Sequence, residues 1–130
     1  MNTNWKKPII KHGKLTKYNY LVYYPENLEL GKFFDIGAFT YINAKYGVTI
    51  EDDVQIGSHC SVYSVSTIDN TSGEVILKTN CKIGSHSTVL PGVTIGKNSI
   101  IGAHSLVNTN IPSNVIAVGV PAKVIKKINE

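Results

Sequence analysis

A six-residue repeat runs through most of this chain. From residue 30 onward a bulky aliphatic side chain recurs at every sixth position, in four groups of three. The twelve positions are Leu30, Ile36, Ile42, Ile50, Ile56, Val62, Leu77, Ile83, Val89, Ile95, Ile101 and Val107. Because six residues are three two-residue steps of extended chain, these side chains point to one face of it. Three hexads make one triangular coil, so the repeat predicts a stack of about four coils.

A second register falls four residues after these aliphatics, on small or medium side chains. Its members are Thr40, Val54, Cys60, Cys81, Ser87, Ser99 and Ser105, with Phe34 as the bulky exception. These positions fit a tight interior corner between two flat faces. Glycine directly follows six of the aliphatics, and glycine permits the close backbone approach that a turn needs. The two registers together predict an all-β fold.

The repeat is interrupted twice, by two extra residues after Ile42 and by nine after Val62. The longer insertion, near residues 64–75, is rich in Ser, Thr, Asn and Gly, which predicts a loop. Insertions in a repeat stack leave as loops and often form the binding face. We expect a single domain over 1–130, with an N-terminal cap segment (1–27), a β-helix (28–110) and a C-terminal tail (111–130) that ends in a short helix.

Composition excludes several classes of protein. The 130 residues carry a formal charge of +4, from thirteen lysines and no arginine against nine acids. Nucleic-acid readers normally rely on arginine, so no nucleic-acid partner is expected. Two cysteines make neither a disulfide scaffold nor a cysteine zinc site. There is no apolar run long enough for a membrane span and no secretory leader pattern, so a cytoplasmic location is expected.

Three of the four histidines occupy the same position of the coil. The third residues after Ile36, Ile56, Ile83 and Ile101 are Phe39, His59, His86 and His104. Successive coils of such a stack lie about 4.8 Å apart, so these side chains should form an outward-facing column. Repulsion between stacked imidazolium rings favours the neutral form. A neutral imidazole is the form that a general base needs near pH 7.

Three segments resemble the hexapeptide-repeat acyltransferases: Ile83–Gly96, Ile101–Val107 and Gly119–Lys126. The resemblance covers roughly residues 28–128 and implies a left-handed parallel β-helix and a homotrimer. It also implies that acetyl-CoA binds in a groove between neighbouring subunits. The chain is most similar to sugar and nucleotide-sugar acetyltransferases of bacterial surface-polysaccharide synthesis. The implied reaction is acetyl transfer to an amino sugar on a nucleotide carrier, with O-acetylation of a sugar hydroxyl as the alternative.

The resemblance assigns residues that would bind the acetyl donor. Ser85 and Ala103 match positions whose backbone contacts the pantetheine arm of CoA. His104, from the histidine column, is predicted as a further neighbour of CoA. Lys123 and Lys126 match basic tail positions that meet the phosphates of CoA. The backbone N–H groups of the turns around Ser85 and Ala103 would also suit the oxyanion of the reaction.

The acceptor side departs from the family pattern. Asn43 matches an acceptor-binding position of the galactoside and maltose acetyltransferase branch. That branch has a catalytic histidine in the loop after the second coil, where this sequence has Thr67. We therefore predict His59 as the general base, with His86 as the second candidate. Asn43, Thr67 and Asp69 are predicted to bind the acceptor, and Asp69 could instead orient an imidazole.

Two alternatives remain open at this point. Three neutral imidazoles can bind zinc, as in the γ-carbonic anhydrases that share this scaffold. That site, however, uses two histidines five residues apart, whereas His86 is followed at that spacing by Pro91 and His59 by Ser64. No metal is therefore expected. A non-catalytic trimeric binding scaffold would explain the repeat, but not the loop, the histidine column and the tail together.

Overall fold

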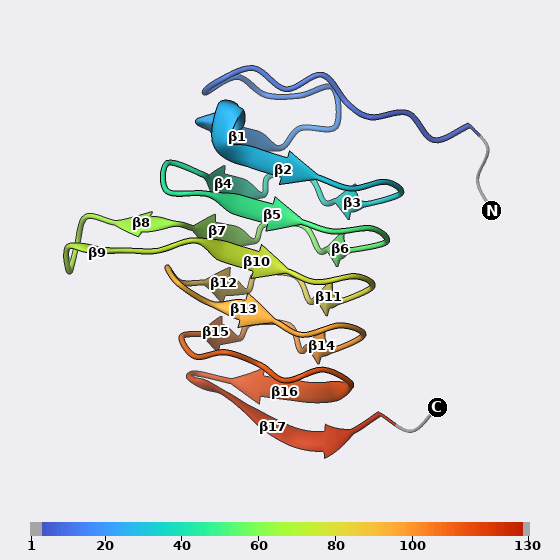
Figure 1. Cartoon of the computed structure of the whole chain (residues 1–130), viewed down its shortest axis with the longest axis vertical. Helices are drawn as coiled ribbons and strands as arrows, with labels where there is room; N and C mark the ends of the chain where they lie inside the picture. Colours follow the sequence, from blue (N-terminus) through green and yellow to red (C-terminus); the bar gives the residue numbers. More distant parts are fainter. Residues whose placement is uncertain (1–3, 129–130) are drawn as a thin grey trace.

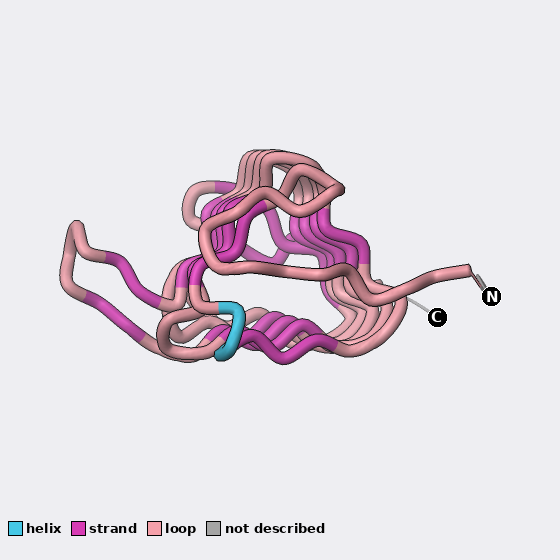
Figure 2. Tube along the Cα trace, turned by 90° about the horizontal axis from the view of Figure 1, so that it is seen from above, coloured by secondary structure: helices cyan, strands magenta, loops and turns pink. Residues whose placement is uncertain are grey.

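The computed structural model describes residues 4–128. The chain winds into a triangular stack of coils whose short strands line up as three sheets (Figures 1 and 2). The first sheet contains β1 (Leu21–Tyr23), β4 (Tyr41–Asn43), β7 (Ser61–Tyr63), β12 (Thr88–Val89) and β15 (Leu106–Val107). The second contains β2 (Leu28–Leu30), β5 (Val48–Ile50), β10 (Val75–Leu77) and β13 (Thr94–Ile95). The third contains β3 (Asp35–Ile36), β6 (Gln55–Ile56), β11 (Lys82–Ile83), β14 (Ile100–Ile101), β16 (Val115–Gly119) and β17 (Ala122–Lys127).

The coils wind with a left hand, as the sequence resemblance implies. In Figure 1 the near strands β2, β5, β10 and β13 run from left to right while the chain descends from its N-terminus to its C-terminus. All strand pairs between coils are parallel. The fold is therefore a left-handed parallel β-helix, which confirms the coil stack predicted from the hexad repeat and the hand implied by the resemblance.

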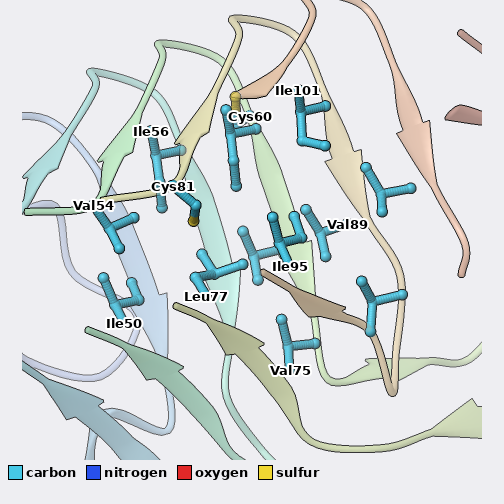
Figure 3. Packing of buried hydrophobic residues seen from close by; sticks show 14 of the residues in the cluster. Ile50, Val54, Ile56, Cys60, Val75, Leu77, Cys81, Val89, Ile95 and Ile101 are labelled. Atoms are coloured by element: carbon cyan, nitrogen blue, oxygen red, sulfur yellow. The ribbon is translucent and has the colours of Figure 1, made fainter. Parts of the chain in front are cut away.

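The repeat aliphatics fill the interior of the stack. All twelve are buried except Leu30, which packs against the core while partly exposed. Every position of the corner register is buried as well, including Cys60 and Cys81 (Figure 3). The buried corner hydroxyls are not left unpaired: that of Thr40 donates to the Gly57 carbonyl at 3.0 Å, and that of Ser87 to the Gly102 carbonyl at 3.1 Å. Each hydroxyl therefore links one coil to the next without a desolvation penalty.

The stack extends beyond the residues that the repeat marks. Strand β1, within the expected cap segment 1–27, pairs with β4, and β16, within the expected tail, pairs with β14. In the cap segment, Trp5 lies against Phe33 and Phe34 and donates its indole N–H to the Phe34 carbonyl at 3.1 Å. Residues 1–3 of the cap and 129–130 of the tail lie outside the described residues.

The prediction of a short C-terminal helix within residues 123–128 is wrong. Residues Ala122–Lys127 form β17, which runs antiparallel to β16 with Val118 opposite Lys123. The open edge of the third sheet at β16 explains the difference, because unpaired backbone groups at a sheet edge are satisfied by another strand. The described helical structure is one 3₁₀ turn, Pro25–Asn27. No helix among residues 4–128 has the length and apolarity to cross a membrane.

The insertion after the second coil is an ordered hairpin. Strands β8 (Val65–Ser66) and β9 (Thr71–Ser72) pair antiparallel, with Ser66 opposite Thr71. The hairpin projects sideways from the stack, where Figures 1 and 2 both draw it apart from the coils. Ile68 at its tip is 95% exposed.

Candidate functional site

The predicted histidine column is present at the corner between the third and first sheets. The ring centroids of His59 and His86 lie 4.7 Å apart with planes 2° from parallel, and those of His86 and His104 lie 4.8 Å apart at 9°. Phe39 continues the column above His59, at 5.3 Å and 41°. All four side chains are exposed. The spacing equals the separation of neighbouring strands, so the stacking follows from the fold itself.

The backbone at this corner adopts the left-handed region. The φ angles are 60° at His59, 60° at His86 and 59° at His104. Non-glycine residues pay roughly 1 kcal/mol for this conformation. Hydrogen bonds between coils hold it: the N–H of His86 donates to the Ser58 carbonyl and that of His104 to the Ser85 carbonyl, each at 3.0 Å. The column is therefore a rigid part of the stack.

Ser85 and Ala103 lie in the same corner, each directly before a histidine of the column. The N–H groups of Gly84 and Gly102 are engaged, with the carbonyls of Ile101 at 2.8 Å and Ala117 at 2.9 Å. Within residues 4–128 no hydrogen bond is formed by the N–H groups of Ser85 and Ala103. These two donors therefore have no partner among residues 4–128, and they are the ones predicted to meet the pantetheine arm.

A pocket of about 420 Å³ lies between the hairpin and the outer face of the first sheet. It brings together two of the predicted acceptor residues, Asn43 and Thr67. Its other lining residues are Tyr41, Tyr63, Val65, Ser66, Ile68 and Leu90. The Asn43 amide donates to the Tyr41 hydroxyl at 3.2 Å and accepts from the Lys45 N–H at 3.1 Å. We refer to this space as the hairpin pocket.

Two tyrosines of the hairpin pocket were missed by the sequence analysis. The rings of Tyr41 and Tyr63 lie 5.5 Å apart, tilted by 46°. They flank the buried residues Ile42 and Val62, so strand alternation points them outward. That alternation was the available signal, because an aromatic beside a buried repeat position must face solvent or a ligand. Tyrosine rings offer an apolar face and a hydroxyl, which together suit a sugar ring or a nucleobase.

Asp69 does not line the hairpin pocket. Hydrogen bonds from the side chains of Ser66 and Thr71 hold the pKa of the Asp69 carboxyl below its usual range, and the Thr71 hydroxyl lies 2.9 Å from it. A carboxylate with a lowered pKa is a weaker base. The structure thus gives Asp69 a role in shaping the hairpin tip, whereas the predicted contact with an acceptor stays a prediction.

The histidine column and the hairpin pocket lie at opposite ends of the strands of the first sheet. His59 precedes β7 and Tyr63 ends it, so four extended steps of about 3.3 Å, or about 13 Å, separate them. Within one chain, the residues predicted for the donor and for the acceptor therefore do not meet. Lys123 and Lys126 are exposed on β17, at the C-terminal end of the third sheet.

The histidine geometry also bears on metal binding. The lone pairs of an imidazole lie in the plane of its ring, and the three planes are close to parallel. The three rings thus present faces to each other rather than nitrogens to a common point. Among residues 4–128 the structure contains no group of three or more His, Cys, Asp or Glu side chains that could hold a metal ion.

Fold and site together define a left-handed parallel β-helix of six-residue repeats, with an exposed imidazole corner and a pocket beside an inserted hairpin. The family described as bacterial transferase hexapeptide (six repeats) matches residues 74–116. The galactoside O-acetyltransferase of Escherichia coli (strain K12) is 39% identical over 116 residues, which cover 82% of this chain and 57% of that protein. These matches confirm the resemblance that the sequence predicts. The chain spans a little over half the length of the curated relatives it matches.

Two solved structures share the fold and have named activities. A maltose O-acetyltransferase from Clostridium difficile 630 superposes with a TM-score of 0.76 at 30% identity, over 86% of this chain and 65% of that one. AntD, an N-acyltransferase from Bacillus cereus solved with dTDP and 3-hydroxybutyryl-CoA, has a TM-score of 0.76 at 25% identity. The match covers 88% of this chain and 79% of AntD. The relatives thus include both O- and N-acyltransferases.

Proposed function

We propose that this chain is an acetyltransferase that moves an acetyl group from acetyl-CoA to an amino sugar carried on a nucleotide. One observation carries the proposal. The same chain has a corner with two N–H donors that lack a hydrogen bond beside a stacked imidazole column, and an aromatic pocket under an inserted hairpin. The corner with these N–H donors suits a thioester and its oxyanion, and the aromatic pocket suits a sugar ring or a nucleobase. The cytoplasmic location expected from the sequence and a role in surface-glycan synthesis are part of this proposal.

A homotrimer would join the two halves of the site. Because about 13 Å of strand separates His59 from the hairpin pocket within one chain, the imidazole corner of one subunit would face the hairpin pocket of its neighbour. Threefold rotation makes three equivalent sites of this kind. Acetyl-CoA would lie in the groove between subunits, with Ser85 and Ala103 on its pantetheine arm, His104 beside it, and Lys123 and Lys126 near its phosphates.

The reaction itself needs one nucleophile and one proton acceptor. The acceptor amine attacks the thioester carbonyl, a C–N bond forms, and the tetrahedral oxyanion is stabilised by backbone N–H groups. The C–S bond then breaks and CoA leaves as its thiolate, to which the general base returns the proton taken from the amine. His59, with His86 as the second candidate, takes the proton that the amine loses. Asn43 and Thr67 position the acceptor on the tyrosine rings, and Asp69 keeps the hairpin in shape.

O-acetylation of a sugar hydroxyl is the second candidate, favoured by the 39% identity to a galactoside O-acetyltransferase. A hydroxyl must lose its proton as it attacks, whereas an unprotonated amine attacks first and loses its proton afterwards. The presence of Thr67 where the resemblance expects a loop histidine therefore fits an amine better. This residue is the reason for preferring N-transfer.

The test is a thiol-release assay with the purified chain, acetyl-CoA and two panels of acceptors. One panel holds nucleotide-linked amino sugars and the other galactosides and maltose. We expect micromolar binding of acetyl-CoA by calorimetry, at one site per chain, and turnover of at least one amino sugar. Turnover of hydroxyl acceptors alone would establish the second candidate. No binding of acetyl-CoA by calorimetry or thermal shift would overturn both and leave a binding scaffold.

A further inference from the structure

A larger pocket lies outside the site described above, at the N-terminal end of the stack. Its volume is about 500 Å³, and the segment 6–18 forms all of its walls. Five lysines line it: Lys6, Lys7, Lys11, Lys14 and Lys17. We call it the lysine pocket. Figure 1 draws this segment across the top of the coils, beyond β1 and β2.

The segment that carries the lysine pocket is tied to the stack. The Gly13 N–H donates to the Val22 carbonyl at 2.8 Å, and the Thr16 N–H to the Tyr20 carbonyl at 2.9 Å. At its start, the Trp5 indole is hydrogen-bonded to Phe34. These bonds anchor both ends of the segment. The lysines are therefore presented by a fixed backbone rather than by a loose tail.

The charged side chains that line the lysine pocket are all positive. All five lysines are exposed, and neither Asp nor Glu lines the pocket. The first acid of the chain is Glu26. A neighbouring cavity, which shares Lys6 and Tyr18 with the lysine pocket, has Asp35 as the one acid in its lining. Five ammonium groups carried by one segment attract anions within a Debye length, about 8–10 Å at physiological salt.

Apolar side chains are exposed among these lysines. Ile9 is 82% exposed, Leu15 60% and Tyr18 48%, and all three line the same pocket. A small dissolved anion would use the lysines and gain nothing from Ile9 or Leu15. The surface of an anionic bilayer would use both, because apolar side chains enter the headgroup boundary while lysines meet the headgroups.

We propose that the lysine pocket docks this protein onto an anionic lipid bilayer. The assembly strengthens the argument, and this step rests on the proposed trimer. A threefold rotation turns each N-terminal end to the same side of the assembly, so three lysine pockets face one plane. Three weak contacts on one surface bind far more tightly than one. The catalytic sites, along the sides of the stack, stay open to solvent.

Co-sedimentation with vesicles tests the proposal. One set of vesicles is pure phosphatidylcholine, and the other contains about 30% phosphatidylglycerol. We expect the chain to sediment with the anionic vesicles alone, and more weakly as salt is raised. At about 1 kcal/mol per lysine, the double variant Lys11→Glu/Lys14→Glu should lower the partition coefficient about 25-fold or more. Ile9→Ser/Leu15→Ser should lower it about tenfold with no change in charge.

The matched control is Lys78→Glu/Lys97→Glu. It changes the net charge equally, from +4 to 0, and both lysines are exposed outside the lysine pocket. Its binding to vesicles should stay within about threefold of the unmodified chain. An equal loss in this control would mean that net charge alone acts, and would overturn the proposal. So would stoichiometric binding of tripolyphosphate without vesicle binding, because the pocket would then hold a soluble anion.

The outcome can be separated from that of the proposed function. Vesicle binding is measured without acetyl-CoA, and light scattering reports the oligomeric state of the same sample. A trimer that turns over a soluble acceptor but ignores anionic vesicles overturns this inference alone. Vesicle binding by a protein without affinity for acetyl-CoA overturns the proposed function alone. Thermal melts of each variant confirm that it is folded.

Discussion

The imidazoles of His59 and His86 stack at 4.7 Å, 2° from parallel, on backbones that share a φ of 60°. Their spacing is that of neighbouring strands, so any residues at this corner would form a column. What the sequence adds is the choice of imidazole, a side chain that can accept a proton near neutral pH. The left-handed backbone limits which substitutions can test that choice, since few residue types adopt it without strain.

Replacing His59 with asparagine should lower kcat by about 10² or more, because the general base is lost. Asparagine is preferable to alanine here, because it tolerates the left-handed backbone. His59→Ala should lose similar activity, and its backbone strain should change little because histidine and alanine both carry a Cβ in this conformation. Steady-state kinetics and thermal unfolding of both variants give the comparison.

The control for this experiment is His12→Gln, which changes a histidine outside the column. The ring of His12 accepts a hydrogen bond from the Tyr24 N–H at 2.9 Å, so its loss should affect stability slightly and kcat by no more than about twofold. An unchanged kcat in a folded His59→Asn variant would refute the assignment of the base. Loss of activity only in His86→Asn would transfer the role to that residue.

The core and the column could be predicted because the repeat has a period. Cys60 and Ser87 differ in chemistry, but both stand four residues after a buried aliphatic and both are buried. The same counting put His59, His86 and His104 in line. Periodicity fixes which face a residue lies on, and this information is local to the sequence.

The parts that escaped prediction depend on contacts outside the period. Strand β17 forms because β16 leaves an open edge, which the residues 122–127 do not reveal by themselves. Strands β8 and β9 have two residues each, too few for a visible pattern. The distance between His59 and the hairpin pocket depends on the direction of β7. For this reason the separation of the two half-sites emerged only from the structure.

The asparagines at a second corner make a testable contribution to stability. The Asn80 amide donates to Asn98 at 2.9 Å and the Asn98 amide to Asn114 at 2.8 Å, and Asn98 has a φ of 66°. Asn98→Ala loses both hydrogen bonds and places alanine in a strained backbone conformation. The free energy of unfolding should therefore fall by about 2–3 kcal/mol. Asn98→Gly loses the bonds without the strain. Chemical denaturation should therefore show glycine about 1 kcal/mol more stable than alanine, and the reverse order would contradict this account.

The close approach of coils at Gly57 predicts a severe effect of one methyl group. A Cβ at Gly57 would lie 2.6 Å from the Ser85 nitrogen and 2.9 Å from its Cα, and backbone cannot move aside cheaply. Gly57→Ala should cost about 3 kcal/mol and, by displacing Ser85, raise KM for acetyl-CoA. Gly92→Ala is the matched control: no atom lies within 4 Å, so only its φ of 83° matters, at about 1 kcal/mol. Equal melting temperatures for the two variants would disprove the packing argument.

The buried thiol of Cys81 predicts how stability falls at alkaline pH. Burial, followed by the nearby charge of Glu51, raises the pKa of this thiol from 9.0 to about 12. Below pH 9 the thiol is protonated in both the folded and the unfolded chain. The stabilisation that comes from its raised pKa is therefore fully present there. Between pH 9 and 12 the unfolded chain releases the proton while the folded chain keeps it. Each pH unit in that window should therefore lower the free energy of unfolding by about 1.4 kcal/mol.

Cys81→Val removes this linkage with little change in packing, because Val54 fills the same corner position one coil earlier. At pH 7 the variant should match the unmodified chain within about 1.5 kcal/mol. From pH 9 upward it should gain on the unmodified chain, because its alkaline limb is shallower. Tyr20, whose pKa burial also raises to about 12, is present in both proteins and cancels in the comparison. Denaturant titrations at pH 8, 9, 10 and 11 measure the gap, and parallel stability curves over that range would mean that the Cys81 thiol does not control the alkaline limb.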